Sequence, residues 1–120
     1  MKKFFTIIIP FAIAAVIALQ FTACETYVLP ELSVSPDTLR FGASEDSLIT
    51  SVKSNVIWTA EPDDRGEEWI SAVPDYWEGP GEIVVHAKTN DSRTPRSAVI
   101  TVKSETITRQ LVIEQAGQPE

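Results

Sequence analysis

Along most of the chain, apolar and polar residues alternate with a period of two. The alternation is clearest late in the sequence, where the apolar positions are Ile83, Val85 and Ala87, then Ala98, Ile100 and Val102, then Leu111 and Ile113. This spacing predicts strands whose apolar faces form one core while the other faces meet water. Val84 and Val112 depart from the alternation and predict a second, partly covered face.

Seven or eight strands are predicted from this pattern, and no segment shows the recurrence of an amphipathic helix. They span residues 32–34, 38–41, 48–53, 57–60, 69–73, 82–88, 98–103 and 107–115. Prolines 36, 62, 74, 80 and 95 all fall between them, where a missing N–H does not interrupt a ladder. Two sheets packed on their apolar faces bury such strands economically. The sequence therefore predicts an all-β, immunoglobulin-like β-sandwich of seven or eight antiparallel strands.

The start of the chain is typical of a targeting segment. Lys2 and Lys3 precede an apolar run over residues 4–19, as in the first two regions of a secretory signal. A helix of this length would reach about 24 Å, which is less than the roughly 30 Å of a bilayer's hydrocarbon core. Cleavage is therefore favoured over anchoring by a spanning helix.

Small residues stand directly before Cys24, the one cysteine of the chain. The segment Phe21-Thr22-Ala23-Cys24 resembles a bacterial lipobox, in which the cysteine is diacylated and becomes the first mature residue. The alternatives are an ordinary secretory signal or an uncleaved anchor. We predict a signal peptide over residues 1–23, a tether over 24–30, one domain over 31–117 and a tail over 118–120.

Charge and composition exclude several functional classes. The chain of 120 residues has a net charge of -7, and removal of Lys2 and Lys3 with the signal changes this to -9, so nucleic acid is not an expected partner. Membrane attachment is expected through acyl chains on Cys24 alone. One cysteine and one histidine are too few for a structural zinc site, and the sequence implies no cofactor.

Several short motifs follow one another through the predicted domain. They are Val52 to Asn55, Trp58, Trp69 to Ser71, Gly79-Pro80-Gly81, Ala87 to Asn90, Arg96 to Val102 and Leu111 to Gly117. In order and spacing they resemble the BACON domain, a Bacteroidetes-associated, often N-terminal domain linked to carbohydrate binding. The resemblance implies a β-sandwich of a surface lipoprotein, with Trp58 and Trp69 packed between the sheets.

The segment Pro74-Asp75-Tyr76-Trp77-Glu78-Gly79-Pro80-Gly81 has the composition of a turn, yet it holds two aromatic residues. Tyr76 and Trp77, with Asp75 and Glu78 beside them, predict a plate for a sugar ring with hydrogen-bond acceptors at its rim. The alternative is that Trp77 folds back over one end of the sandwich.

Weaker candidates lie in two other loops. Asn90 and Arg96 flank a polar turn that could reach a glycan, although Asn90 is also an ordinary turn residue. Clustered carboxylates could hold calcium, but a solvated acidic loop is the simpler interpretation; they are Asp63, Asp64, Glu67 and Glu68. His86 lies within a predicted strand with no nucleophile motif nearby, so catalysis is not expected.

These features predict a non-catalytic lipoprotein of the cell envelope, held at the outer membrane by Cys24, that binds a polysaccharide or mucin glycan. The alternative is a structural or protein-interaction module of a surface glycan-handling complex, whose partner is another surface protein.

Replacement of Cys24 by alanine (C24A) tests the lipid anchor. We expect it to abolish lipid attachment and leave the signal uncleaved, because the acylated cysteine is what a lipoprotein peptidase recognises in proteins with such a signal. Metabolic labelling with palmitate measures the attachment, and labelling of the variant at the wild-type level would contradict the prediction.

Overall fold

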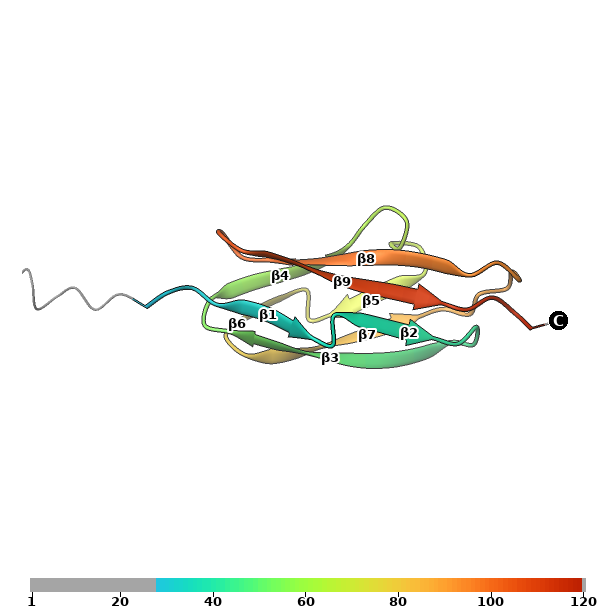
Figure 1. Ribbon diagram of the computed structural model, residues 1–120, viewed down its shortest axis with the longest axis horizontal. Coiled ribbons are helices and arrows are strands. Elements are labelled where there is room, and N and C mark those ends of the chain that lie inside the picture. Colours follow the sequence, from blue (N-terminus) through green and yellow to red (C-terminus); the bar gives the residue numbers. More distant parts are fainter. Residues whose placement is uncertain (1–27, 120) are drawn as a thin grey trace, which may run out of the picture.

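The computed structural model describes residues 28–119, which form two facing β-sheets (Figure 1). The signal segment and Cys24 lie outside these residues. The nine strands are β1 (Leu32–Ser35), β2 (Thr38–Phe41), β3 (Asp46–Ser54), β4 (Ile57–Pro62), β5 (Ile70–Val73), β6 (Tyr76–Glu78), β7 (Gly81–Ala87), β8 (Arg96–Lys103) and β9 (Thr108–Gln115). Over the described range, no helix is long and apolar enough to cross a bilayer.

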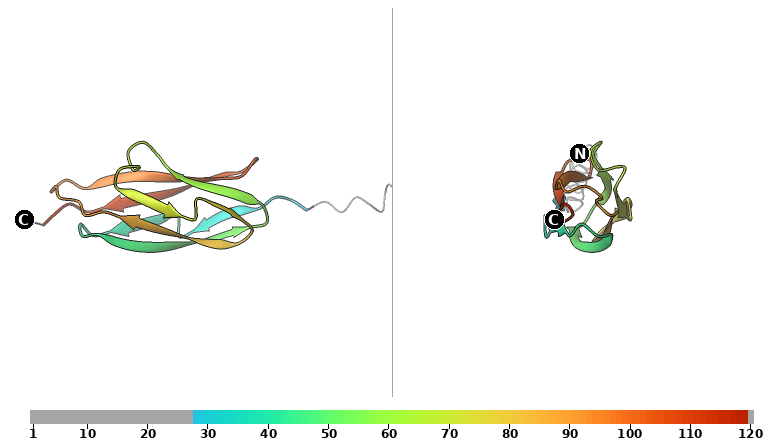
Figure 2. Two further views of the ribbon diagram at one scale, coloured as in Figure 1. Left: turned by 180° about the vertical axis from the view of Figure 1, so that it is seen from behind. Right: turned by 90° about the vertical axis from the view of Figure 1, so that its right-hand side faces the viewer.

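The sheets have the strand orders β1-β3-β7-β5 and β2-β9-β8-β4-β6, and the end-on view shows them as two layers (Figure 2). The chain changes sheets between β1 and β2, at Pro36. The prediction of an immunoglobulin-like sandwich is confirmed, with two differences in detail. The structure has nine strands, one more than the eight predicted, because the segment predicted as a turn forms β6. One pairing, that of β2 with β9, is parallel rather than antiparallel.

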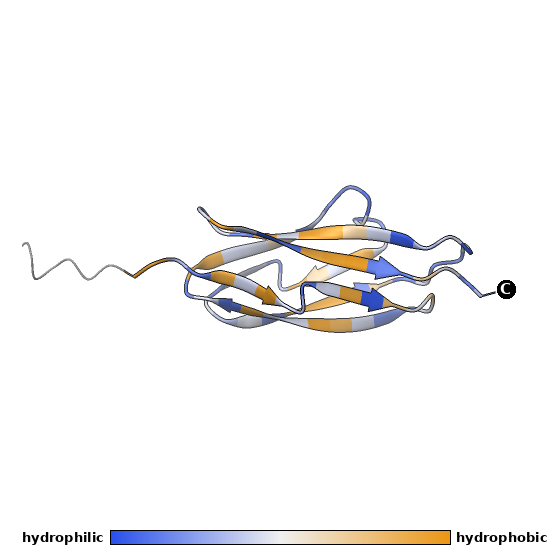
Figure 3. Cartoon of the chain, in the orientation of Figure 1, coloured by the Kyte–Doolittle hydropathy of each residue, from blue (hydrophilic) through white to orange (hydrophobic). Residues whose placement is uncertain are grey.

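The core lies where the alternation predicts it. The eight apolar residues predicted to face inward from β7, β8 and β9 are all 0% exposed, and the middle of β8 and of β9 is coloured as hydrophobic in Figure 3. Val84 is 40% exposed and points to the outer face of its sheet, opposite to Val85.

Two tryptophans connect this core to the surrounding backbone. Trp58 is 0% exposed, and its indole Nε1 donates a hydrogen bond to the Gly79 carbonyl over 2.9 Å. Trp69 is 6% exposed, and its Nε1 donates to the Arg65 carbonyl over 2.8 Å. Both indoles therefore bury their rings while keeping a partner for the N–H, as predicted.

Replacement of Trp58 by alanine is expected to lower the free energy of unfolding by about 3 to 5 kcal/mol, because it removes a fully buried ring and leaves a cavity. Chemical denaturation measures the effect. Val73→Ala is a matched control with a 63% exposed side chain. A loss of less than about 1 kcal/mol for Trp58→Ala would contradict the core assignment.

Candidate functional site

The predicted aromatic turn is in fact an edge strand. β6 pairs antiparallel with β4, with Glu78 opposite Ile57, Trp77 opposite Trp58 and Tyr76 opposite Thr59. Backbone hydrogen bonds continue the pairing at both ends, from Ala60 N to Asp75 O and from Gly79 N to Val56 O. The Pro, Gly and Asp residues that predicted a turn flank the strand on both sides and confine it to three residues.

Because successive side chains of a strand point to opposite faces, β6 separates the two aromatic rings. Trp77 shares a face with its cross-strand neighbour Trp58, which points into the core. Tyr76 shares a face with Thr59, on the outer side of the five-stranded sheet. The two rings therefore cannot form one continuous plate, and each must be considered by itself.

Trp77 lies along the open edge between the two sheets. A side chain at Gly81, on β7 of the opposite sheet, would stand 3.1 Å from the Trp77 ring, so the indole covers this glycine. Its Nε1 donates to the Pro80 carbonyl over 3.1 Å, and the residue remains 48% exposed. Trp77 therefore folds back over the sandwich edge, as the alternative interpretation predicts, with half of its surface still in contact with solvent.

Tyr76 is 60% exposed at the outer edge of the five-stranded sheet. The strand register places it in one row with Thr59, Lys103 and Thr108, which lie on β4, β8 and β9. The neighbouring row contains Ile57 and Glu78. The outer face thus presents a phenol ring and an aliphatic side chain among groups that donate and accept hydrogen bonds.

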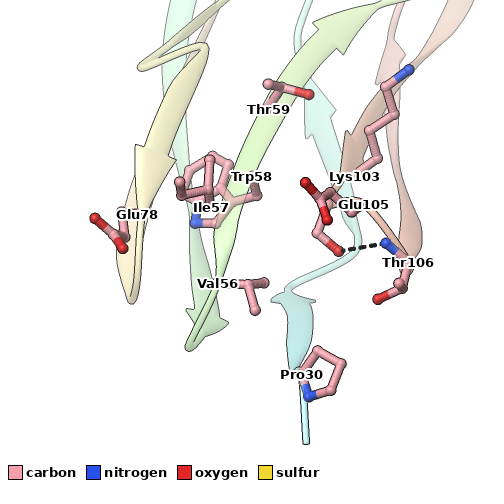
Figure 4. Close-up of a pocket in the computed structure, with 10 residues that line it drawn as sticks. Pro30, Val56, Ile57, Trp58, Thr59, Glu78, Lys103, Glu105 and Thr106 are labelled. Atoms are coloured by element: carbon pink, nitrogen blue, oxygen red, sulfur yellow. Dashed lines mark hydrogen bonds between the residues drawn. The ribbon is translucent and has the colours of Figure 1, made fainter.

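A groove of about 610 Å³ lies beside these rows, at the end of the sandwich where the chain enters β1 (Figure 4). Its lining comes from the start of β4, from β6, from the β8–β9 turn and from the segment before β1. The lining residues are Pro30, Val56, Ile57, Trp58, Thr59, Glu78, Lys103, Ser104, Glu105 and Thr106.

The groove combines an apolar floor with a few charged groups at its rim. Ile57 is 46% exposed beside Glu78, and Glu105 stands on the opposite side, where the β8–β9 turn closes the groove (Figure 4). The Ser104 hydroxyl holds this turn by accepting hydrogen bonds from the backbone N–H groups of Thr106 and Ile107. Such an arrangement suits a ligand with apolar faces and hydroxyl edges.

Sequence reasoning identified Glu78 but missed most of this groove. One signal was present, since Ile57 is an apolar residue on the solvent side of an alternating strand. The contribution of the β8–β9 turn had no sequence signal, because only the folded chain brings Glu105 next to β4.

The other predicted ligand residues lie elsewhere. Asp75 is exposed just before β6. Asn90 is 2% exposed; its Nδ2 donates to the carbonyls of Thr94 and Ala116, and its Oδ1 accepts from Ser92 N. Both amide hydrogens of Asn90 are thus used within the protein, one in the loop and one at the chain after β9.

Arg96 also bonds internally. Its guanidinium donates to Gln115 Oε1 over 2.8 Å and lies 4.3 Å from the centre of the Trp69 ring. The residue lines a second groove, of about 450 Å³, at the opposite end of β8 from the first. Asn90 and Arg96 therefore hold the C-terminal end of the sandwich together, and only Arg96 borders a groove.

The carboxylates of the acidic loop do not gather into a metal-binding group. One carboxylate oxygen of Asp63 accepts a hydrogen bond from the Arg65 guanidinium, and the other accepts one from the Gly66 backbone N–H. Within residues 28–119, no three carboxylate, histidine or cysteine side chains come together as a metal-binding group. His86 contacts Ser47 Oγ through Nδ1 over 2.9 Å and Glu45 through Nε2 over 2.7 Å, on the outer face of the four-stranded sheet.

The family described as the viral BACON domain matches residues 31–118. Among solved structures, a GH5 xyloglucanase from Bacteroides ovatus, in complex with a XXXG heptasaccharide, matches with a TM-score of 0.67 and 19% identity over 73% of this chain. The match covers 19% of the xyloglucanase, so the chain spans about a fifth of that enzyme. No curated protein matches the chain.

Two smaller proteins share the fold over most of their length. A protein from Bacteroides thetaiotaomicron has a TM-score of 0.56 and 14% identity, covering 80% of this chain and 95% of its own. The MSP-like protein SSP-19 of Caenorhabditis elegans has a TM-score of 0.58 and 10% identity, covering 72% of this chain and 100% of its own. At these identities the likeness concerns the sandwich alone.

The opposite orientations of the two aromatic residues predict different effects on stability. Trp77→Ala is expected to lower the free energy of unfolding by about 1 to 2 kcal/mol, because it uncovers Gly81 and the sheet edge. Tyr76→Ala is expected to change it by less than about 0.5 kcal/mol, since the ring projects into solvent. Denaturation curves of both variants measure the difference, and equal losses would show that the two rings are equally packed.

Proposed function

The chain belongs to the viral BACON domain family, and from this membership we propose that it is a non-catalytic glycan-binding module of a cell-envelope lipoprotein. The family is a non-catalytic module associated with carbohydrate binding. In this proposal Cys24 carries the lipid at the outer membrane, and the sandwich over residues 31–118 presents the binding surface.

The observation that carries the proposal is the groove beside β4 and β6, with Tyr76 in the adjoining row. A sugar ring has apolar C–H faces and a rim of hydroxyls, so it needs both a flat apolar contact and polar groups at the edges. Ile57 and the Tyr76 ring supply the apolar contact. Glu78 and Glu105 accept hydrogen bonds from hydroxyls, while Lys103 donates.

Of the residues predicted from sequence, the proposal keeps Tyr76 and Glu78 as ligand contacts. Trp77 supports the site from the other side of β6, through its packing over Gly81. The solved xyloglucanase complex contains an oligosaccharide, which supports testing neutral plant glucans first. An open groove on a small domain predicts weak binding that repeated sugar units along a polymer would strengthen.

Affinity electrophoresis in gels containing xyloglucan, other plant polysaccharides or mucin tests the proposal. Tyr76→Ala is expected to weaken retention by at least tenfold, about 1.4 kcal/mol, because exposed aromatic anchors often dominate small binding surfaces. Tyr76→Phe is the matched control, since it keeps the ring and should retain most of the binding. Glu78→Gln is expected to give a smaller loss.

Two results would contradict this site. Unchanged retention of folded Tyr76→Ala on a glycan that the wild type binds would move the site to the groove that Arg96 lines. Absence of retention of the wild type on every glycan would favour the protein-interaction alternative.

A further inference from the structure

The outer face of the four-stranded sheet differs from an ordinary solvated sheet face. Five of its eleven outward strand positions carry serine, namely Ser33, Ser35, Ser47, Ser51 and Ser71. The outer face of the other sheet carries more long charged side chains, among them Arg40, Glu61, Lys103 and Glu114. Small side chains leave the four-stranded sheet flat enough for another flat surface to approach its strands closely.

An exposed aliphatic row crosses the middle of this serine-rich face. Ile49 on β3 pairs with Val84 on β7, and Val84 pairs with Val73 on β5. Their exposed fractions are 53%, 40% and 63%. Three aliphatic side chains in one continuous row form an apolar patch rather than scattered single residues, and such patches mark interaction surfaces.

The charges of the face are arranged on the two sides of this row. On one side, Glu82 stands one row away on β7 and Lys53 stands two rows away on β3. On the other side, His86 stands one row away on β7, and Glu45, which contacts His86 Nε2, precedes β3. The carboxylate nearer the row on one side is Glu82, with Lys53 beyond it, and on the other side His86 is nearer the row, with Glu45 beyond it.

We propose that this face binds a second copy of the same chain, with a twofold axis along the aliphatic row. Such an axis places each of Ile49, Val84 and Val73 against the same residue of the second copy. Residues on one side of the row then face residues that lie on the other side of the row in the second copy. Glu82 then meets His86 of the second copy, and Lys53 meets Glu45 of the second copy. Apolar groups lie on apolar groups, and the opposite charges of Lys53 and Glu45 face each other, as a self-complementary twofold interface requires.

The dimer should be weak. Strands about 4.8 Å apart and about four rows of outward residues give a contact of about 400 Å² per copy, which is at the low end for a specific interface. The net negative charge of the chain opposes association, but over distances beyond about 8 Å it is screened at physiological ionic strength. The proposal is independent of the glycan site, which lies on the other sheet.

Disulfide cross-linking of the full chain in membranes of expressing cells tests the interface. Val84→Cys places a thiol close to the twofold axis, so oxidation should link two copies directly. Ser97→Cys, on the outer face of the five-stranded sheet, is the matched control, and the wild type measures the background from Cys24. We expect at least fivefold more dimer for Val84→Cys than for Ser97→Cys; equal yields would overturn the proposal.

Charge exchange in the Val84→Cys background tests the orientation. Lys53→Glu should lower the dimer yield at least threefold, because it places two carboxylates against each other, and Lys53→Glu combined with Glu45→Lys should restore it. Glu61→Lys, on the outer face of the five-stranded sheet, should leave the yield in the same background unchanged. Circular dichroism verifies folding of each variant. A yield that neither charge variant alters, or a double variant that does not recover, would overturn the twofold arrangement.

Discussion

The hydrogen bond from the Trp58 indole to the Gly79 carbonyl links the core of this domain to its candidate site. Trp58 is fully buried, yet its N–H reaches the carbonyl of the residue directly after β6. Gly79 has a φ of 83°, a left-handed conformation that a side chain would strain, and this lets the chain turn towards β7 directly after the strand. Since Gly79 also donates to Val56, the same residue closes the β4–β6 pairing on which the orientation of Tyr76 depends.

The two outer faces of the sandwich have different physical characters, although one core serves both. The five-stranded sheet carries long charged side chains and a groove, which suits a hydroxyl-rich ligand. The four-stranded sheet carries serines and the Ile49–Val84–Val73 row, which suits a flat apolar surface. Because binding at one face leaves the other uncovered, the proposed glycan site and the proposed dimer face can be occupied at the same time. A dimer would then present two glycan sites to one polymer.

Alternating hydropathy was sufficient to predict the core and most strands, because inward positions such as Ile83 and Ile113 are set by burial alone. It failed at β6, where Pro, Gly and Asp determine the local composition and pairing with β4 determines the conformation. That error also merged Tyr76 and Trp77 into one predicted plate. The groove depends on contacts distant in sequence, such as Glu105 beside β4, and no local pattern encodes such a neighbour.

The parallel pairing of β2 and β9 gives the domain a mechanical property. The described chain enters and leaves at opposite ends of the sandwich (Figure 1), and these two strands run in the same direction with four residue pairs in register. A pulling force on the two ends therefore loads the hydrogen bonds of this pair in shear, so that several must break together rather than one at a time. A domain pulled by the chain before β1 and by the chain after β9 would resist extension at this seam.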